Sequence, residues 1–241
     1  MSEFAIPSPH GDLPIYFSAP IEHGRSPGVV VIHDAGGMSN DLRRQADWLA
    51  REGFLAAAPN LYHEGTMLTC IRQIMRDVGA RRGRSFDEID ATRAWLTRQP
   101  GCSGKVGIIG FCMGGGFALL LASGYGYAAS SVNYGTASRD VYTENYLARA
   151  CPIVASYGAK DWGNRGNAAQ LERVLSAEGV PHDVKEYPDA GHAFMNDHEG
   201  AGDRIPIVFR LLSTLTRSAY HDPSAQDARR RIVAFFKMYL A

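Results

Sequence analysis

The chain has 241 residues, of which 45% are hydrophobic and 21% charged, and its 25 basic residues balance 25 acidic ones. This length and apolar content suffice for one sizeable buried core. The balanced charge produces no global basic field that would attract nucleic acid or anionic lipid, so we expect neither a nucleic acid nor a membrane as a partner.

The N-terminal sequence Met1-Ser2-Glu3-Phe4 has no basic region and no long apolar run, so no signal peptide is expected. No apolar stretch of the sequence approaches the length of a membrane span. The four cysteines are scattered over positions 70, 102, 112 and 151, a pattern that favours reduced thiols over a disulfide framework. We therefore expect a cytoplasmic protein.

Strands and helices alternate along the first half of the sequence. Residues 3–7 and 13–18 form a predicted hairpin, and residues 28–33 a continuous apolar strand. Residues 40–52 have apolar positions at helical spacing and are followed by Gly53. Residues 54–58 are the next predicted strand. The segment Ser85-Phe86-Asp87-Glu88 matches a capping box and predicts a helix to about residue 99.

The second half of the sequence continues this alternation. Such alternation is typical of a mostly parallel central sheet with helices on both faces, that is, of an α/β fold. We find no repeat, low-complexity tract or long linker, so residues 1–241 are expected to form a single domain. The predicted elements are strands at 105–109, 128–134, 152–157 and 182–187, and helices at 117–122, at about 167–178 and from 224.

A cysteine stands where a strand turns sharply into a helix, in the run Gly110-Phe111-Cys112-Met113-Gly114. A glycine two positions before and after Cys112 leaves room for a strained strand–turn–helix elbow, which lifts the central side chain to the carboxyl edge of the sheet. A glycine-rich turn around a buried cysteine would give the same local pattern. The motifs further along the chain favour the elbow.

Two further motifs each follow a predicted strand: Gly158-Ala159-Lys160-Asp161 and Gly191-His192-Ala193-Phe194. Nucleophile, acid and histidine in this order, at the carboxyl ends of three strands, is the chain order of the α/β-hydrolase triad. Together with Gly-Phe-Cys-Met-Gly-Gly, these motifs resemble the dienelactone hydrolase (carboxymethylenebutenolidase) family. The resemblance extends to residues 29–62 and 220–240.

Members of that family are single-domain α/β-hydrolases with a Cys-His-Asp triad that cleave esters or lactones. The resemblance implies this fold, no cofactor, and the roles of nucleophile for Cys112, acid for Asp161 and base for His192. Thiolate attack on a carbonyl gives an oxyanion and then an acyl-enzyme that water hydrolyses. The expected oxyanion donors are the backbone N–H groups of Met113, which follows the nucleophile, and of Ala35, in the loop after the 28–33 strand.

Asp34 departs from the family, whose members usually carry a glutamate there that holds the resting thiol. We expect Asp34 to modulate the thiol of Cys112, directly or through water. The alternative is that Asp34 only caps the strand end or the following Gly36-Gly37 turn. His33 is a rival base, although a residue at this place more often faces the sheet interior or a neighbouring strand.

Other polar clusters carry weaker signals. His192, Asp197 and His198 match no metal-ligand spacing, so no metal site is expected. The basic run 81–84 is typical of a solvated surface, with anion binding as the alternative. Apolar positions at helical spacing predict an extra helical segment at about residues 198–219, as a lid, a pocket wall or a dimer contact.

The sequence thus predicts a hydrolase that cleaves a small-molecule carboxylic ester or lactone through an acyl-cysteine. Two alternatives share its features. One is a thioesterase or acyltransferase with the same triad, and the other is a catalytically silent ligand-binding protein on the same fold. A homodimer is compatible with the sequence.

Overall fold

The computed structural model describes residues 1–21, 24–204 and 219–241. Within this part of the chain, eight strands form one sheet in the order β1-β2-β4-β3-β5-β6-β7-β8. Strand β2 (Gly11–Ser18) pairs antiparallel with both β1 (Ser2–Ser8) and β4 (Leu55–Pro59), and the remaining neighbours are parallel. The predicted α/β fold with a mostly parallel sheet is confirmed.

The central parallel strands are buried, because helices cover both of their faces. The apolar run of β3 (Ser26–Ile32) is typical of such a strand. Parallel strands end at the same edge of a sheet, so the residues that follow them lie close together. The other parallel strands are β5 (Cys102–Phe111), β6 (Ala129–Asn133), β7 (Ile153–Gly158) and β8 (His182–Tyr187).

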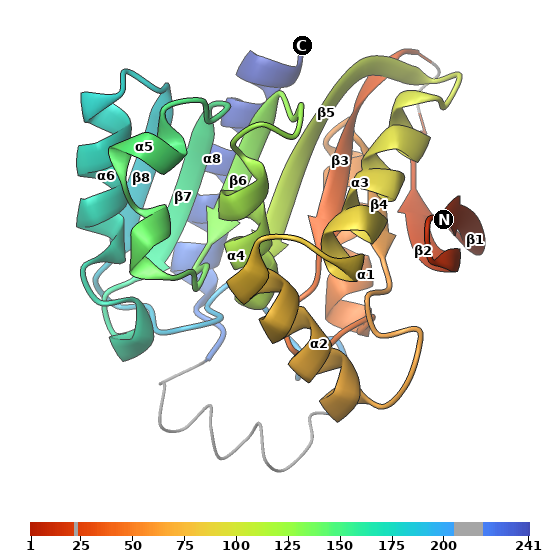
Figure 1. Cartoon of the computed structure of the whole chain (residues 1–241), viewed down its shortest axis with the longest axis horizontal. Coiled ribbons are helices and arrows are strands. Elements are labelled where there is room, and N and C mark those ends of the chain that lie inside the picture. Colours follow the sequence, from red (N-terminus) through yellow and green to blue (C-terminus); the bar gives the residue numbers. More distant parts are fainter. Residues whose placement is uncertain (22–23, 205–218) are drawn as a thin grey trace.

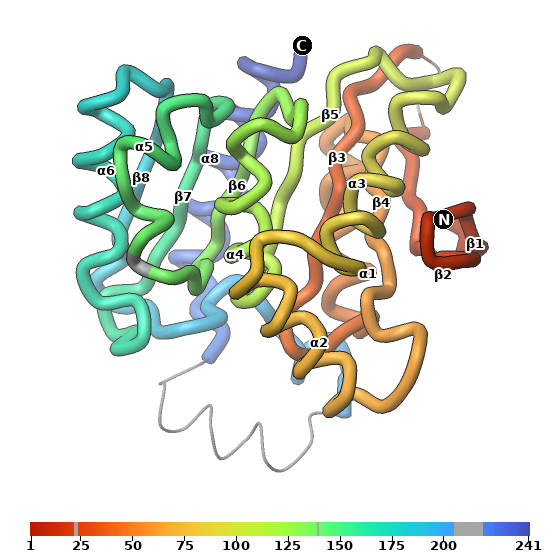
Figure 2. Tube along the Cα trace, in the orientation of Figure 1, coloured from red at the N-terminus to blue at the C-terminus, as the bar shows by residue number. Residues whose placement is uncertain are grey.

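Two apolar layers hold the helices to the sheet (Figure 1). One layer packs α3 (Arg84–Thr97), α4 (Met113–Leu121) and α6 (Asn167–Ala177) onto the front face in this view. The other packs α1 (Asn40–Arg51) and α8 (Asp222–Leu240) onto the back. The tube in Figure 2 traces the same layers. The shorter or peripheral elements are α2 (Met67–Ala80), α5 (Glu144–Leu147), η1 (Arg139–Val141) and η2 (Trp162–Asn164).

The predicted capping box at Ser85 is wrong, although the helix it announced is present. The N-cap of helix α3 lies two residues earlier, at Gly83, and has no side-chain hydrogen bond of its own. Instead, the backbone N–H and the hydroxyl of Ser85 both donate to Asp77 Oδ2, at 3.0 and 2.8 Å. A carboxylate from the neighbouring helix α2 therefore satisfies this terminus, and a local motif could not reveal it.

The predicted extra helix at about residues 198–219 falls largely outside the described residues, since 205–218 are not among them. Residues 198–204 form turns and loop. Among the helices that the structure describes, none is both long and apolar enough to cross a membrane.

The first turn of α4 lies so close to the sheet that its second residue, Gly114, has no room for a side chain. A Cβ added at Gly114 would overlap the carbonyl oxygen of Ile32 in β3, whereas a Cβ at Gly79, in helix α2, would meet no atom within 4 Å. We therefore expect Gly114→Ala to lower the free energy of unfolding by about 2 kcal/mol or more.

Gly79→Ala is the matched control and should raise the free energy of unfolding by roughly 0.5–1 kcal/mol, because alanine is the better helix former. Urea unfolding of both variants measures the two changes. A Gly114→Ala protein as stable as the parent would contradict the close approach of α4 to β3.

Candidate functional site

The cysteine of the elbow occupies a strained backbone conformation. Cys112 has φ 55° and ψ −114°, in the left-handed half of the φ range that residues with a side chain rarely adopt. The turn can close because Gly110 has no side chain. A Cβ at this position would overlap the carbonyl oxygen of Gly114. The result is a half-buried thiol at the N-terminus of α4, where the helix dipole favours negative charge.

A buried carboxylate and an imidazole lie together on the next loops. His192 Nδ1 is 2.6 Å from Asp161 Oδ2. Asp161 also accepts from Asn164 Nδ2 at 2.7 Å and from the Gly163 N–H at 3.0 Å. Burial by itself would raise the pKa of Asp161, but these hydrogen bonds, with the one from His192 foremost, hold it below its usual range.

His192 connects this carboxylate to the thiol. Burial alone would lower the pKa of His192, but its hydrogen bond with Asp161 and the nearby thiol of Cys112 raise the pKa to about 10. The ring edge of Tyr134 also packs on the imidazole, with centroids 5.3 Å apart. The structure thus brings Cys112, His192 and Asp161 together, with His192 hydrogen-bonded to Asp161 and close to the thiol.

Two backbone N–H groups lie free beside the elbow. Met113 is the first residue of α4, so its N–H has no partner within the helix. Ala35 lies in the loop after β3, and β3 pairs with the elbow strand up to Ile32 and Gly110. Within the described ranges, neither N–H donates a hydrogen bond to the protein. Both are available to a bound oxygen.

The carboxylate of Asp34 has partners other than the thiol. Its Oδ1 accepts from the Gly36 N–H at 2.7 Å, and its Oδ2 is 2.8 Å from His198 Nε2. No hydrogen bond joins Asp34 to Cys112 in the part of the chain that the structure describes. The geometry therefore favours the turn-capping alternative for Asp34, and it adds a partner that the sequence did not indicate.

His198 fastens the loop that carries His192 to the opposite side of the site. Its Nδ1 lies 3.0 Å from Asp203 Oδ2, and Asp203 accepts from the first N–H groups of helix α1, those of Asn40 and Asp41. Burial opposes the charge on His198, but its carboxylate partners, Asp34 foremost, raise the pKa of His198 to about 10. His198 thus forms ion pairs with Asp34 and Asp203. Residues 1–21, 24–204 and 219–241 hold no group of His, Cys, Asp or Glu side chains suited to a metal ion.

Sequence reasoning missed Tyr134 and Asn164. Tyr134 follows β6 with a positive φ of 39°, and its carbonyl accepts from Asn164 Nδ2 at 3.1 Å. Asn164 thereby links the acid loop to the residue that packs on His192. Its place three residues after Asp161 is the one signal that could have indicated it.

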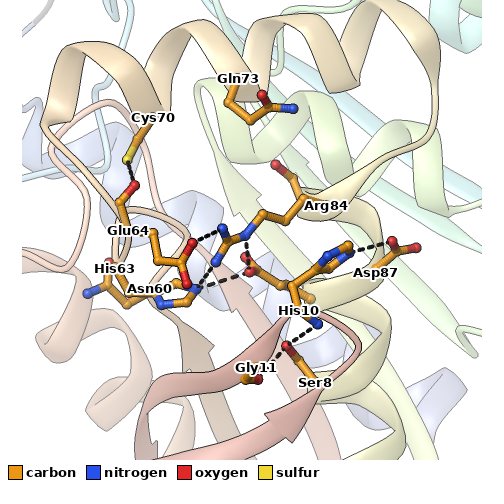
Figure 3. Close-up of polar contacts among 12 residues, drawn as sticks. Ser8, His10, Gly11, Asn60, His63, Glu64, Cys70, Gln73, Arg84 and Asp87 are labelled. Atoms are coloured by element: carbon orange, nitrogen blue, oxygen red, sulfur yellow. Dashed lines mark hydrogen bonds and ion pairs between the residues drawn. The ribbon is translucent and has the colours of Figure 1, made fainter.

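Two of the three arginines in the basic run 81–84 are paired rather than open to an anion. Arg84 donates to Glu88 and Glu64, beside His63, in the polar cluster of Figure 3. Arg81 donates to Asp140 and lies over the ring of Tyr146, 4.9 Å from its centroid. These carboxylates already occupy both guanidinium groups, so the geometry favours a structural interpretation of this cluster.

The strained cysteine elbow, the Asp–His pair and the order of the three residues point to one family. The sequence profile of the dienelactone hydrolase family matches residues 13–240. The chain belongs to the dienelactone hydrolase family. The predicted resemblance is thereby confirmed, and with it the expectation of a dienelactone hydrolase-like hydrolase.

Similar proteins come from several bacteria. A Yersinia pestis protein provisionally named carboxymethylenebutenolidase is 27% identical, with 98% of this chain and 88% of that protein aligned. The carboxymethylenebutenolidase of Rhodococcus opacus is 25% identical over 93% of this chain and 86% of its own length. A crystal structure from Klebsiella pneumoniae, provisionally named dienelactone hydrolase, has a TM-score of 0.76 at 25% identity, covering 99% and 98% of the two chains.

Replacing Asp34 tests whether its carboxylate acts on the thiol or on the loop. Since Asn keeps the acceptor for the Gly36 N–H and loses the ion pair with His198, we expect Asp34→Asn to cost about 2 kcal/mol of stability at pH 6. The pKa of His198 is raised to about 10 from its ordinary 6.5, so this contribution is complete below pH 6.5 and is lost as the pH rises through about 10. Urea unfolding at pH 6, 8 and 10 should show that the difference in the free energy of unfolding between variant and parent narrows as the pH rises.

Alkylation of Cys112 by iodoacetamide should change less than about twofold in the same variant, because a thiol that Asp34 does not touch keeps its reactivity. Asp12→Asn, at an exposed position of the hairpin, controls for the loss of one negative charge. Markedly faster alkylation in Asp34→Asn would restore Asp34 as a residue that restrains the thiol.

Proposed function

We propose that this protein hydrolyses a carboxylic ester or lactone through an acyl group carried by Cys112. The observation that carries the proposal is that His192 hydrogen-bonds to Asp161 and lies close to the thiol of Cys112, which stands at a strained elbow. The names of the relatives from Yersinia and Rhodococcus support an enol-lactone or a similar small ester as substrate.

The first half of the reaction makes the acyl-enzyme. The sulfur of Cys112 bonds to the carbonyl carbon while His192 holds the proton, and the carbonyl π electrons move onto oxygen. The N–H groups of Met113 and Ala35 then stabilise the oxyanion. When the carbonyl re-forms, the C–O bond to the alcohol breaks, and His192 gives its proton to the departing alkoxide.

The second half restores the enzyme. His192 takes a proton from water, whose oxygen bonds to the acyl carbon, and the C–S bond breaks as the second oxyanion collapses. The products are the carboxylic acid and the thiolate paired with protonated His192. Asp161 accepts from Nδ1 throughout and so keeps Nε2 directed to the reacting atoms.

The charges around the thiol support an ion pair as the resting state. Asp161 and the nearby Cys112 raise the pKa of His192 to about 10, so the imidazole carries a proton on both nitrogens at neutral pH and can face a thiolate. Asp34 lies nearby, but its charge is directed to His198. We also propose a cytoplasmic location, because the four cysteines are all free, as a reducing compartment requires.

Cys112→Ala should abolish turnover of nitrophenyl acetate, because no other thiol stands at an elbow. Cys151→Ala is the matched control: Cys151 is also partly buried and free, and its loss should leave turnover within about twofold of the parent. Intact-mass analysis after brief reaction should find one acetyl group, on Cys112. An acetyl group on Cys70, Cys102 or Cys151 would refute the assignment. A panel of esters, lactones and thioesters then separates the hydrolase from a thioesterase.

The alkylation of Cys112 should depend on pH in a way that reports the ion pair. In the parent protein a protonated His192 close to the sulfur of Cys112 should favour the reactive thiolate. We therefore expect iodoacetamide to alkylate His192→Ala at least about tenfold more slowly than the parent at pH 6.5. His10→Ala, on the exposed hairpin turn, serves as control. Coincident pH profiles for parent and His192→Ala would exclude the ion pair.

A further inference from the structure

His33 is a wholly buried histidine next to the site that the proposed chemistry does not use. It follows β3 directly, and its exposed fraction is 0%. Its ring packs edge-on against Tyr62, with centroids 4.7 Å apart. Its Nδ1 is 2.7 Å from the carbonyl oxygen of Asp34, while its Nε2 has no hydrogen-bond partner among the described residues.

These contacts define the state of the ring. A carbonyl oxygen can only accept, so Nδ1 carries the proton and donates it to Asp34. Burial, which outweighs the nearby Asp34, lowers the pKa of His33, so the ring is neutral and Nε2 is bare. With Nε2 buried and Nδ1 engaged, His33 has no route by which to act as the rival base considered from the sequence.

The Asp34 carbonyl, which accepts the hydrogen bond from His33, belongs to the same peptide unit as the N–H of Ala35. In a trans peptide, C=O and N–H point in opposite directions, so fixing the oxygen also fixes the direction of the N–H. The same carbonyl accepts from the Gly37 N–H at 3.2 Å. Donors on a carbonyl oxygen also polarise the peptide and strengthen its N–H as a donor.

The rest of the loop is held as well, which leaves the Ala35 N–H as the free group. The Gly36 N–H donates to Asp34 Oδ1, and the Tyr62 hydroxyl donates to the Ala35 carbonyl at 3.4 Å. The backbone of Ile32 and His33 lies against the first turn of α4. A Cβ added at Gly114 would overlap the carbonyl oxygens of both residues. His33 is therefore placed between the elbow and the loop of the second oxyanion donor.

We propose that His33 is a positioning residue of the oxyanion hole, whose Nδ1–H holds the Asp34 carbonyl and so directs and strengthens the Ala35 N–H. This inference rests on the proposed esterase function and deepens it. According to this inference, two reactions at the sulfur of Cys112 should respond differently to the loss of the His33 N–H. Acylation by an ester creates an oxyanion and needs the Ala35 N–H, whereas alkylation by iodoacetamide creates none.

The test compares two variants of similar shape. His33→Asn keeps an N–H donor close to the place of Nδ1, and His33→Leu removes it. We expect His33→Leu to lower the kcat for nitrophenyl acetate by roughly 10- to 100-fold, less than the loss of a whole oxyanion donor, with KM nearly unchanged. Iodoacetamide alkylation should stay within about twofold of the parent. His33→Asn should recover most of the kcat.

Two results would overturn the proposal: equal loss of acylation and alkylation in His33→Leu, which indicates general damage to the nucleophile, or equal kcat in the Leu and Asn variants. If His33→Leu does not fold, His33→Met also lacks the donor and takes its place in the comparison. Failure of the esterase proposal is distinguishable, because the parent protein would then show no turnover dependent on Cys112.

Discussion

The close approach of helix α4 to the edge of the sheet is the constraint on which the site depends. Gly110 and Gly114 let the elbow close, since a side chain at either position would overlap backbone atoms. The closed elbow is accompanied by the positive φ of Cys112. The same closure leaves the Met113 N–H at an unpartnered helix terminus. One steric condition therefore sets the positions of the proposed nucleophile and of one proposed oxyanion donor, and places both at the N-terminal end of the helix dipole.

Charge pairing is the second organising feature of the site. The loop after β8 carries two histidines, and each pairs with a carboxylate from another part of the chain: His192 with Asp161, and His198 with Asp34. A buried carboxylate without a partner would be costly, and pairing removes that cost while fixing the geometry. The loop is thus held at two points, by Asp161 and by Asp34.

The sequence predicted those parts of the structure that rest on local periodicity and chain order. The apolar spacing of α1, the burial of β3 and the order of Cys112, Asp161 and His192 are all local or sequential signals, and the structure places the three side chains together. The sequence could not predict contacts between residues that are far apart in the chain. Asp77 caps α3 from another helix, and His198 reaches Asp34 across 164 positions. Such pairs leave no pattern in the sequence, because only the tertiary fold brings them within range.

The identity of residue 34 shows how one methylene group can redistribute charge in such a site. An aspartate reaches the N–H two residues ahead, and Asp34 does so with Gly36. This contact turns its second oxygen towards His198 rather than towards the thiol. The family resemblance implies a glutamate at this position that holds the resting thiol, whereas Asp34 makes no hydrogen bond to Cys112 among the described residues. In this chain the ion pair with His198 balances the charge of the Asp34 carboxylate. Under the proposed mechanism, Asp34 therefore opposes negative charge on the sulfur less than an unpaired carboxylate would.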